Sequence, residues 1–263
     1  MKRHGGLILL KNRAWSSLQS GGRQVSSASQ QALTDGFLEV REYDIDPGSF
    51  GRFTSLVEET ADLRRRVLPV VGLFKPDIGG VLNSFTHMYH YKNLEERDMI
   101  RAKALKTPAW SEEYLPVAKG MMLGQRNALY SAARSIMDAA GSRPVSDILG
   151  QNAGAGGMMI EIRRYQLHPG YDTVPTILSS FEKGIPEKMA VSPDTELIFF
   201  GFTDIGMLNN VIEVWRYPSA AACMASRQEA RKVQAWRDTI HAVTPKVQHF
   251  TSTFMYSMKG SPV

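Results

Sequence analysis

Polar and apolar positions alternate from residue 37 to residue 45, which is the period of a strand with one buried face. Pro47 and Gly48 end this strand, because proline fixes its own φ and glycine frees the backbone that follows. The next stretch has apolar residues every three or four positions, which predicts an amphipathic helix. The apolar stripe of this helix consists of Phe53, Leu56, Val57, Leu63 and Val67.

Two further strands are predicted at about 70–76 and 81–91, joined by a turn that contains Asp and Gly. A second helical region follows and carries Trp110, and a last strand runs near 121–130. The predicted order is therefore β-α-β-β-α-β, which is the ferredoxin-like arrangement with helices on one face of an antiparallel sheet.

The same pattern returns in the second half of the chain, so the protein is a tandem repeat. Residues 37–48 align with residues 159–170 at an offset of 122, with Glu, Arg, Tyr, Pro and Gly in register. Further along, the offset is 126. There, Leu82-Asn83 aligns with Leu208-Asn209, Tyr91 with Tyr217, Arg101 with Arg227, and Ala109-Trp110 with Ala235-Trp236.

The second copy predicts the same elements as the first. Its strands are expected at about 195–203, 207–217 and 247–257. The apolar stripe of its first helix is Val174, Ile177, Leu178, Phe181 and Ile185. Pro186 is expected to bend or shorten the end of this helix, because proline removes a backbone donor.

The fold class is therefore α+β, with two tandem ferredoxin-like domains at 37–131 and 158–257. Residues 132–157 between them are predicted to be a Gly-rich linker, since five glycines lie between 141 and 157.

Side chains alternate along a strand, so Leu38 and Val40 share one face and are expected to lie under the helices. The opposite face of each sheet is then open, and two such faces can pack together and close a barrel. The residues on these faces are the candidates for a ligand pocket. They are Glu39, Arg41, Tyr43, His87, Tyr89, Tyr91, Glu161, Arg163, Tyr165, Glu213, Trp215 and Tyr217.

Two interpretations of these candidate residues remain open. Aromatic walls with a few charges suit a pocket for a small ligand. Alternatively, the Glu and Arg side chains pair with each other inside the barrel and set the register of the two halves, because buried ion pairs are no proof of function.

Composition and charge narrow the functional classes. Hydrophobic residues make up 43% of the chain, and no run approaches the roughly 20 apolar residues of a membrane span. Five of the 31 basic residues lie in residues 1–25, and the other 26 balance the 26 acidic residues. No basic surface concentrated on the folded part is therefore expected, and a nucleic-acid partner is not predicted.

The N-terminal segment has the composition of a mitochondrial transit peptide directed to the matrix. Residues 1–34 contain no Asp or Glu, five Lys or Arg and six Ser. A secretory signal is disfavoured, because the apolar run that ends at Leu10 is short and is interrupted by Lys11 and Arg13. We assign the transit peptide to residues 1–25, where Arg23 precedes the expected cleavage site.

No catalytic, metal or cofactor-binding set is predicted. Cys223 is the single cysteine, and a small buried hydrophobe is favoured over a reactive thiol. His87 and His90 lie three apart on a strand, so they face opposite sides and cannot hold one metal. The glycines at 154–157 precede a strand, whereas a dinucleotide site needs them at the start of a helix.

The stretch from Gly79 to Trp110 resembles the NIPSNAP family. The resemblance rests on Gly79-Gly80-Val81-Leu82-Asn83, then His87-Met88-Tyr89-His90-Tyr91-Lys92-Asn93-Leu94-Glu95-Glu96-Arg97, and Pro108-Ala109-Trp110. The family strand resembles His-hydrophobic-Trp-x-Tyr. This chain departs from it with Tyr89 in place of Trp in the first copy and Glu213 in place of His in the second. The resemblance covers 37–131 and 158–257.

The resemblance implies a dimeric α/β-barrel fold, residence in mitochondria and no established catalytic set. Some members of the family are implicated in mitophagy, as tags that autophagy proteins recognise, and the family name records a proposed link to vesicle transport. Association into a homo-oligomer is expected separately, because unpaired strand edges invite pairing. The first functional hypothesis is therefore a non-enzymatic protein that acts by protein interaction or small-ligand binding. The alternative is a cofactor-free oxygenase or haem-handling enzyme, since the same barrel fold serves both.

Overall fold

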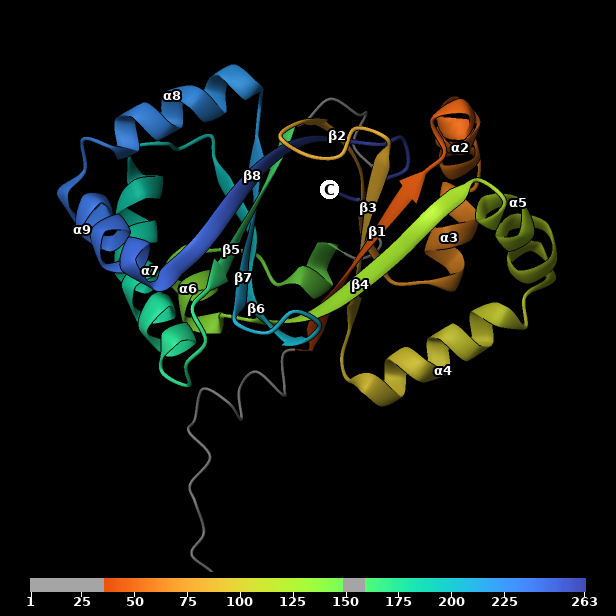
Figure 1. Cartoon of the computed structure of the whole chain (residues 1–263), viewed down its shortest axis with the longest axis horizontal. Coiled ribbons are helices and arrows are strands. Elements are labelled where there is room, and N and C mark those ends of the chain that lie inside the picture. Colours follow the sequence, from red (N-terminus) through yellow and green to blue (C-terminus); the bar gives the residue numbers. More distant parts are fainter. Residues whose placement is uncertain (1–35, 149–158) are drawn as a thin grey trace, which may run out of the picture.

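Eight strands close into one barrel within this single chain, and helices cover the barrel on two opposite sides (Figure 1). The computed structural model describes residues 36–148 and 159–263, so the predicted transit peptide lies outside the described residues. Around the barrel the strands follow the order β1-β3-β2-β8-β5-β7-β6-β4, and every neighbouring pair is antiparallel. The sequence left open whether the barrel closes within one chain or between two, and the strand order shows closure within one.

The first half contributes the neighbouring strands β4, β1, β3 and β2. Its helices lie outside the sheet, on the right in Figure 1. The elements of this half are β1 Phe37–Ile45, η1 Pro47–Ser49, α2 Phe50–Glu59, α3 Ala61–Val67, β2 Val70–Ile78, β3 Ser84–Tyr91, α4 Leu94–Leu105, η2 Ala109–Tyr114, α5 Leu115–Lys119 and β4 Met122–Ala132.

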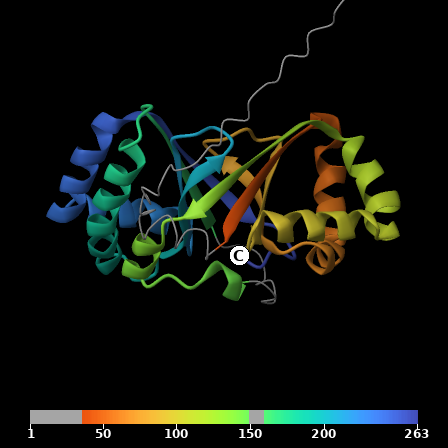
Figure 2. The same cartoon turned by 90° about the horizontal axis from the view of Figure 1, so that it is seen from below.

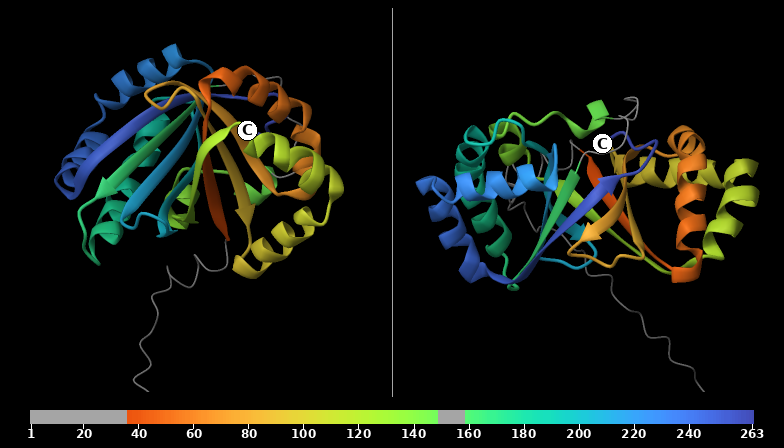
Figure 3. Two further views of the ribbon diagram at one scale, coloured as in Figure 1. Left: turned by 45° about the vertical axis from the view of Figure 1, so that its right-hand side comes forward. Right: turned by 90° about the horizontal axis from the view of Figure 1, so that it is seen from above.

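The second half contributes β8, β5, β7 and β6, and its helices cover the opposite side of the barrel (Figures 2 and 3). The halves meet where β2 pairs with β8 and where β4 pairs with β6. The elements of this half are β5 Met159–Leu167, α7 Thr173–Ala190, β6 Glu196–Ile205, β7 Asn210–Tyr217, α8 Ala220–Ala230, α9 Gln234–Val243, η4 Thr244–Lys246 and β8 Val247–Ser257.

The first helix of each copy differs from the prediction in detail. In the first half the helix is interrupted at Thr60, which separates α2 from α3. In the second half α7 passes through Pro186 and continues to Ala190, so the expectation that Pro186 shortens the helix was wrong. A proline removes one backbone bond, and burial of Phe181 and Ile185 on the same helix holds it in place.

The two faces of the sheet are the reverse of the prediction. Leu38 and Val40 point into the barrel, where they join Met88, Ile160 and Ile212 in one apolar cluster drawn from both halves. The face with Glu39, Arg41 and Tyr43 lies under the helices instead. An eight-stranded barrel is just wide enough for side chains to fill its interior, so medium-sized apolar residues suit the inside.

The segment between the halves is partly ordered against the second half. Within the predicted linker at 132–157, α6 Arg134–Ala139 buries Ile136 and Met137 in the apolar core, and η3 Val145–Ile148 follows. Residues 149–158 lie outside the described residues. Within the described ranges, no helix is long and apolar enough to cross a membrane.

Candidate functional site

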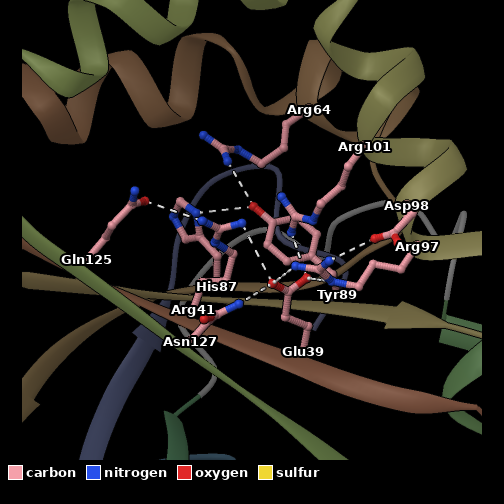
Figure 4. Close-up of polar contacts among 10 residues, drawn as sticks. All are labelled: Glu39, Arg41, Arg64, His87, Tyr89, Arg97, Asp98, Arg101, Gln125 and Asn127. Carbon is pink, nitrogen blue, oxygen red and sulfur yellow. Dashed lines mark hydrogen bonds and ion pairs between the residues drawn. The ribbon is translucent and has the colours of Figure 1, made fainter. Parts of the chain in front are cut away.

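Glu39 is the centre of a polar network between the sheet and the helices of the first half (Figure 4). Its Oε2 accepts hydrogen bonds from Arg101 Nη2 at 2.7 Å and from Arg97 Nε at 3.2 Å. Its Oε1 accepts from Asn127 Nδ2 at 2.8 Å and from Arg97 Nη2 at 3.1 Å. Arg41 adds a longer ion pair at 3.6 Å. The carboxylate is completely buried yet fully hydrogen-bonded.

Local sequence explains why the two helical arginines reach one carboxylate. Arg97 and Arg101 are four residues apart on α4, so they project from the same face of the helix. The start of α4 is held by Asn93, whose side chain accepts a hydrogen bond from Glu96 N at 2.8 Å. Glu96 in turn accepts from Lys92 N, which completes a reciprocal cap.

The environment of Glu39 keeps this residue ionised. Burial alone would raise the pKa of its carboxyl group, but the hydrogen bond from Arg97 and the charge of Arg101 act in the opposite direction. Asn127 and Arg41 add to them, and the pKa of Glu39 is lowered. The candidate site therefore has a negative charge at its base at neutral pH.

Arg64 is a second buried charge in the same layer, and its partners are aromatic. Its Nη1 donates to Tyr89 Oη at 2.9 Å, and Nη2 donates to Tyr114 Oη. The guanidinium also lies 5.0 Å from the ring centre of Trp110. Among the described residues, no carboxylate forms an ion pair with Arg64. A buried cation without a counterion is suited to an anionic ligand.

A small cavity of about 210 Å³ opens beside these groups. It is lined by Arg41, Arg64 and Arg101, by the aromatic residues Tyr89 and Trp110, and by several neighbouring apolar side chains. A cavity of about 150 Å³ is large enough to hold benzene. The cavity of the first half is only slightly larger, so it has room for a small molecule only.

The second half repeats the carboxylate network at the equivalent positions. Glu161 is completely buried and accepts hydrogen bonds from Arg227 and from Ser252 Oγ, the latter at 2.8 Å. Arg163 forms an ion pair with it at 3.5 Å, and the Cys223 Sγ lies 3.4 Å from Glu161 Oε2. Burial, followed by the charge of Glu161, raises the pKa of the Cys223 thiol to about 12, so this cysteine is a buried thiol with little nucleophilic character.

Lys188 occupies the place that Arg64 has in the first half. Its Nζ lies 5.0 Å from the ring centre of Trp236, just as Arg64 lies 5.0 Å from Trp110. It also lies 3.5 Å from the ring centre of Trp215. Trp215 donates from Nε1 to Glu213 Oε2 at 2.5 Å. The second copy thus holds Lys188 and Glu213 where the first holds Arg64 and His87.

The cavity of the second half is larger, with a volume of about 760 Å³, which lies in the range of pockets for small metabolites. Among the described residues, its lining contains basic groups and no acidic side chain. Apolar and aromatic side chains form the remaining walls. The lining includes Arg163, Lys188, Arg227, Trp236, Ile240 and Phe250.

The structure separates the twelve predicted pocket residues into two groups, one in each half. Glu39, Arg41, Tyr43, His87, Tyr89 and Tyr91 lie under α3 and α4, and Glu161, Arg163, Tyr165, Glu213, Trp215 and Tyr217 lie under α7 and α8. The expectation of one shared site inside the barrel was therefore wrong. The physical reason is that arginines from the helices supply the counter-charges that make the polar face suitable for burial.

The helical residues that complete both sites are not among the twelve predicted pocket residues. Four of these residues appeared in the sequence only as aligned pairs that supported the repeat, namely Arg101 with Arg227 and Trp110 with Trp236. Lys188 had a subtler signal, because it follows Phe181 and Ile185 at helical spacing and so lies on the apolar face of α7.

His87 is completely buried and neutral. Burial lowers its pKa well below 6.5, and the positive charges of Arg64 and Arg41 lower it further. Its ring lies 4.8 Å from that of Tyr43. In the described part of the chain, no group of three or more His, Cys, Asp or Glu residues is placed to bind a metal.

Solved structures show the same fold with low sequence identity. A proposed monooxygenase from Fusobacterium nucleatum matches with a TM-score of 0.58 and 12% identity, over 85% of this chain and 92% of its own. An anthrone oxidase-like protein matches with a TM-score of 0.54 and 14% identity, over 86% of this chain and 92% of its own. These likenesses establish the barrel fold.

Sequence comparison identifies the family. The chain is 23% identical over 211 residues to human NipSnap homolog 3A, covering 78% of both proteins. It is 29% identical over 105 residues to the NipSnap homolog of Dictyostelium discoideum, covering 40% of this chain and 44% of the other. The NIPSNAP family model matches residues 38–135 and 160–262, one match for each half of the barrel. The chain therefore belongs to the NIPSNAP family.

Proposed function

We propose that this protein binds small organic anions in the layer between its sheet and its helices, with the cavity of the second half as the main site. The observation that carries the proposal is the basic lining of a cavity of about 760 Å³, to which the described residues contribute no acidic side chain. The buried carboxylates Glu161 and Glu213 offset only part of this charge, so an anion completes the balance.

The wall residues define the body of the ligand. Trp236, Phe250 and Ile240 provide aromatic and apolar surface, whereas Arg163 and Arg227 provide donors for a carboxylate. A carboxylic acid with an aromatic or branched apolar group fits both requirements. Phenyllactate is therefore a suitable probe of the site.

The experiment is a calorimetric titration of the full chain with phenyllactate, together with native mass spectrometry of protein purified without added ligand. Arg163→Gln is expected to weaken binding about tenfold or more, because it removes a charged hydrogen-bond donor. Lys232→Gln is the matched control, since Lys232 is exposed and pairs only with Glu229 in the described structure. Equal affinity in all three proteins would contradict the proposal.

We further infer that the protein is mitochondrial and that its two halves are tandem ferredoxin-like repeats. The acid-free, basic N-terminal segment supports the location, and the strand orders β4-β1-β3-β2 and β8-β5-β7-β6 support the repeats. Import into isolated mitochondria, with and without residues 1–25, tests the location. Roles in mitophagy or vesicle transport, and homo-oligomer formation, are proposals that a pull-down from mitochondria and a sedimentation measurement would test.

A second candidate function is cofactor-free oxygenation in the first half. The fold likeness to a proposed monooxygenase and to an anthrone oxidase-like protein favours it, together with neutral His87 beside Tyr43 and Tyr89. A neutral imidazole can accept a proton from an acidic substrate. Oxygen uptake with anthrone as substrate, lost in His87→Phe, would support this function. No uptake by the wild type would exclude anthrone as a substrate and leave the anion-binding proposal standing.

A further inference from the structure

We propose that Lys188 is a reactive amine that forms an imine with a carbonyl compound bound in the second-half cavity. The class of ligand is a 2-oxo acid with an aromatic or branched apolar side chain. This inference rests on the proposed function, because the same cavity must first bind the carboxylate of that ligand.

The position of Lys188 is unusual for a lysine. The residue is 2% exposed, and its Nζ makes no hydrogen bond within the described residues. The amine instead lies 3.5 Å from the ring centre of Trp215 and lines the cavity. Lysines are almost never fully buried unless they are paired, and none of the carboxylates described forms an ion pair with this one. Lys188 is one of the residues that line the cavity, and its amine has no hydrogen-bond partner among the described residues that would compete with a ligand.

Burial, more than the surrounding charges, favours the neutral, nucleophilic form of Lys188. Burial lowers its pKa from 10.5 to about 8, and Arg163 lowers it too. Glu213, Glu161 and Cys223 act in the opposite direction. Amines in apolar pockets next to a second cation are activated for attack on carbonyl groups in this way.

The chemistry requires no redox partner. The lone pair of Lys188 Nζ attacks the carbonyl carbon, and a C–N bond forms as the C=O π electrons move to oxygen. Two protons pass from nitrogen to that oxygen, the C–O bond breaks, and water leaves with formation of the C=N bond. Glu213 is the carboxylate whose charge acts most strongly on Lys188.

The first half provides an internal contrast. Arg64 stands at the equivalent place, and a guanidinium that stays protonated cannot form an imine. Its cavity is also smaller, at about 210 Å³. The imine chemistry is therefore assigned to the second half alone, although both halves carry the buried carboxylate and its arginines.

The test uses the full chain with phenylpyruvate as the probe and cyanoborohydride to trap the imine. Peptide mass spectrometry is expected to find one reduced adduct, on the peptide that contains Lys188. Lys188→Arg abolishes the adduct, whereas Lys183→Arg, on the exposed side of the same helix, retains it. Excess phenyllactate, which has the carboxylate and ring but no ketone, slows labelling of the wild type, and this arm needs no variant to fold.

Two outcomes overturn the inference in distinguishable ways. If phenyllactate binds but labelling is spread over exposed lysines with Lys188 unmodified, the anion pocket stands and the imine is excluded. If phenyllactate does not bind and Lys188 is not labelled, the proposed function and the imine both fail.

Discussion

Glu42 and Arg164 contact each other across the two halves, with Arg164 Nη2 donating to Glu42 Oε1 at 2.8 Å. They are 122 residues apart, which is the offset of the repeat at this strand, so each is the counterpart of the other. Aligned positions of the two halves therefore meet at this point. Identical charges there would repel, so the difference between Glu and Arg makes the two halves complementary.

This pair predicts the result of a charge exchange. Glu42→Arg places three arginines together, because Arg126 also pairs with Glu42 at 3.1 Å. We expect it to lower the free energy of unfolding by about 2 kcal/mol or more. The double variant Glu42→Arg/Arg164→Glu is expected to recover part of this loss in urea unfolding. Strictly additive losses would show that the contact does not couple the halves.

Glu39 predicts a loss of stability that depends on pH. Glu39→Gln leaves Arg97, Arg101 and Arg41 without their shared carboxylate, and about 2–4 kcal/mol of unfolding free energy is expected to be lost at pH 7. Because the pKa of Glu39 is lowered in the folded state, its contribution is present above pH 4.5 and declines at lower pH as the group is protonated.

The measurement is urea unfolding of Glu39→Gln and wild type at pH 7 and at pH 3. The difference in unfolding free energy between the variant and the wild type is expected to be smaller at pH 3. Glu112→Gln changes an exposed glutamate in the same half and serves as the control. A gap that stays constant with pH would contradict a stabilising charge at Glu39.

The charge of Lys188 is expected to lower the stability of the folded protein, whereas the charge of Glu39 raises it. The folded protein binds fewer protons than the unfolded chain between about pH 8 and 10.5, so stability rises with pH across that window. Below pH 8 the cost of holding Lys188 charged is up to ~3 kcal/mol, and the contact with Trp215 offsets about 1–2 kcal/mol of it.

Lys188→Met is therefore expected to be slightly more stable than wild type at pH 7, and this advantage should shrink between pH 8 and pH 10. Thermal unfolding at several pH values measures the difference. A variant that is less stable at pH 7 by several kcal/mol would show that the amine has a partner that stabilises it.

The substitution Gly184→Ala has opposite effects on helix propensity and on packing. Alanine is favoured over glycine in a helix by about 1 kcal/mol. A Cβ at Gly184 would, however, lie 2.2 Å from Thr239 Oγ1 and 2.8 Å from its Cβ, on the helix α9 packed against α7. Packing wins, because Thr239 is buried and short, and Gly184→Ala is expected to cost about 1–3 kcal/mol.

Gly51→Ala is the matched control in a helix of the first half, since nothing lies within 4 Å of the added Cβ. It is expected to raise stability by up to about 1 kcal/mol. Chemical denaturation of both variants provides the measurement. Stabilisation by Gly184→Ala would mean that α7 and α9 can separate without cost.

Much of the fold followed from local pattern. Alternation predicted β1 to the residue, and the strand from 247 to 257 was also predicted at its observed bounds. Helix α6 was missed, because Ile136 and Met137 are buried only through contact with the second-half core. A short segment that is buried by distant residues shows little hydrophobic periodicity in its own sequence.

The candidate sites were predicted in part. The twelve residues on the polar strand faces are buried or partly buried near charged helical residues, but the sequence could not say which face the helices cover. Leu38 and Glu39 alternate equally well in either orientation. The choice depends on Arg97 and Arg101, which approach Glu39 only after α4 has packed on the sheet.

The sequence by itself determined the repeat, the order of strands and helices, and the family, because each depends on residue types at fixed spacing along the chain. The tertiary structure decided that the barrel closes within one chain, that an apolar cluster from both halves lies inside it, and that Lys188 lies beside Trp215 and lines a cavity. These features depend on contacts between residues far apart in the sequence, whose burial energies arise only when the halves come together.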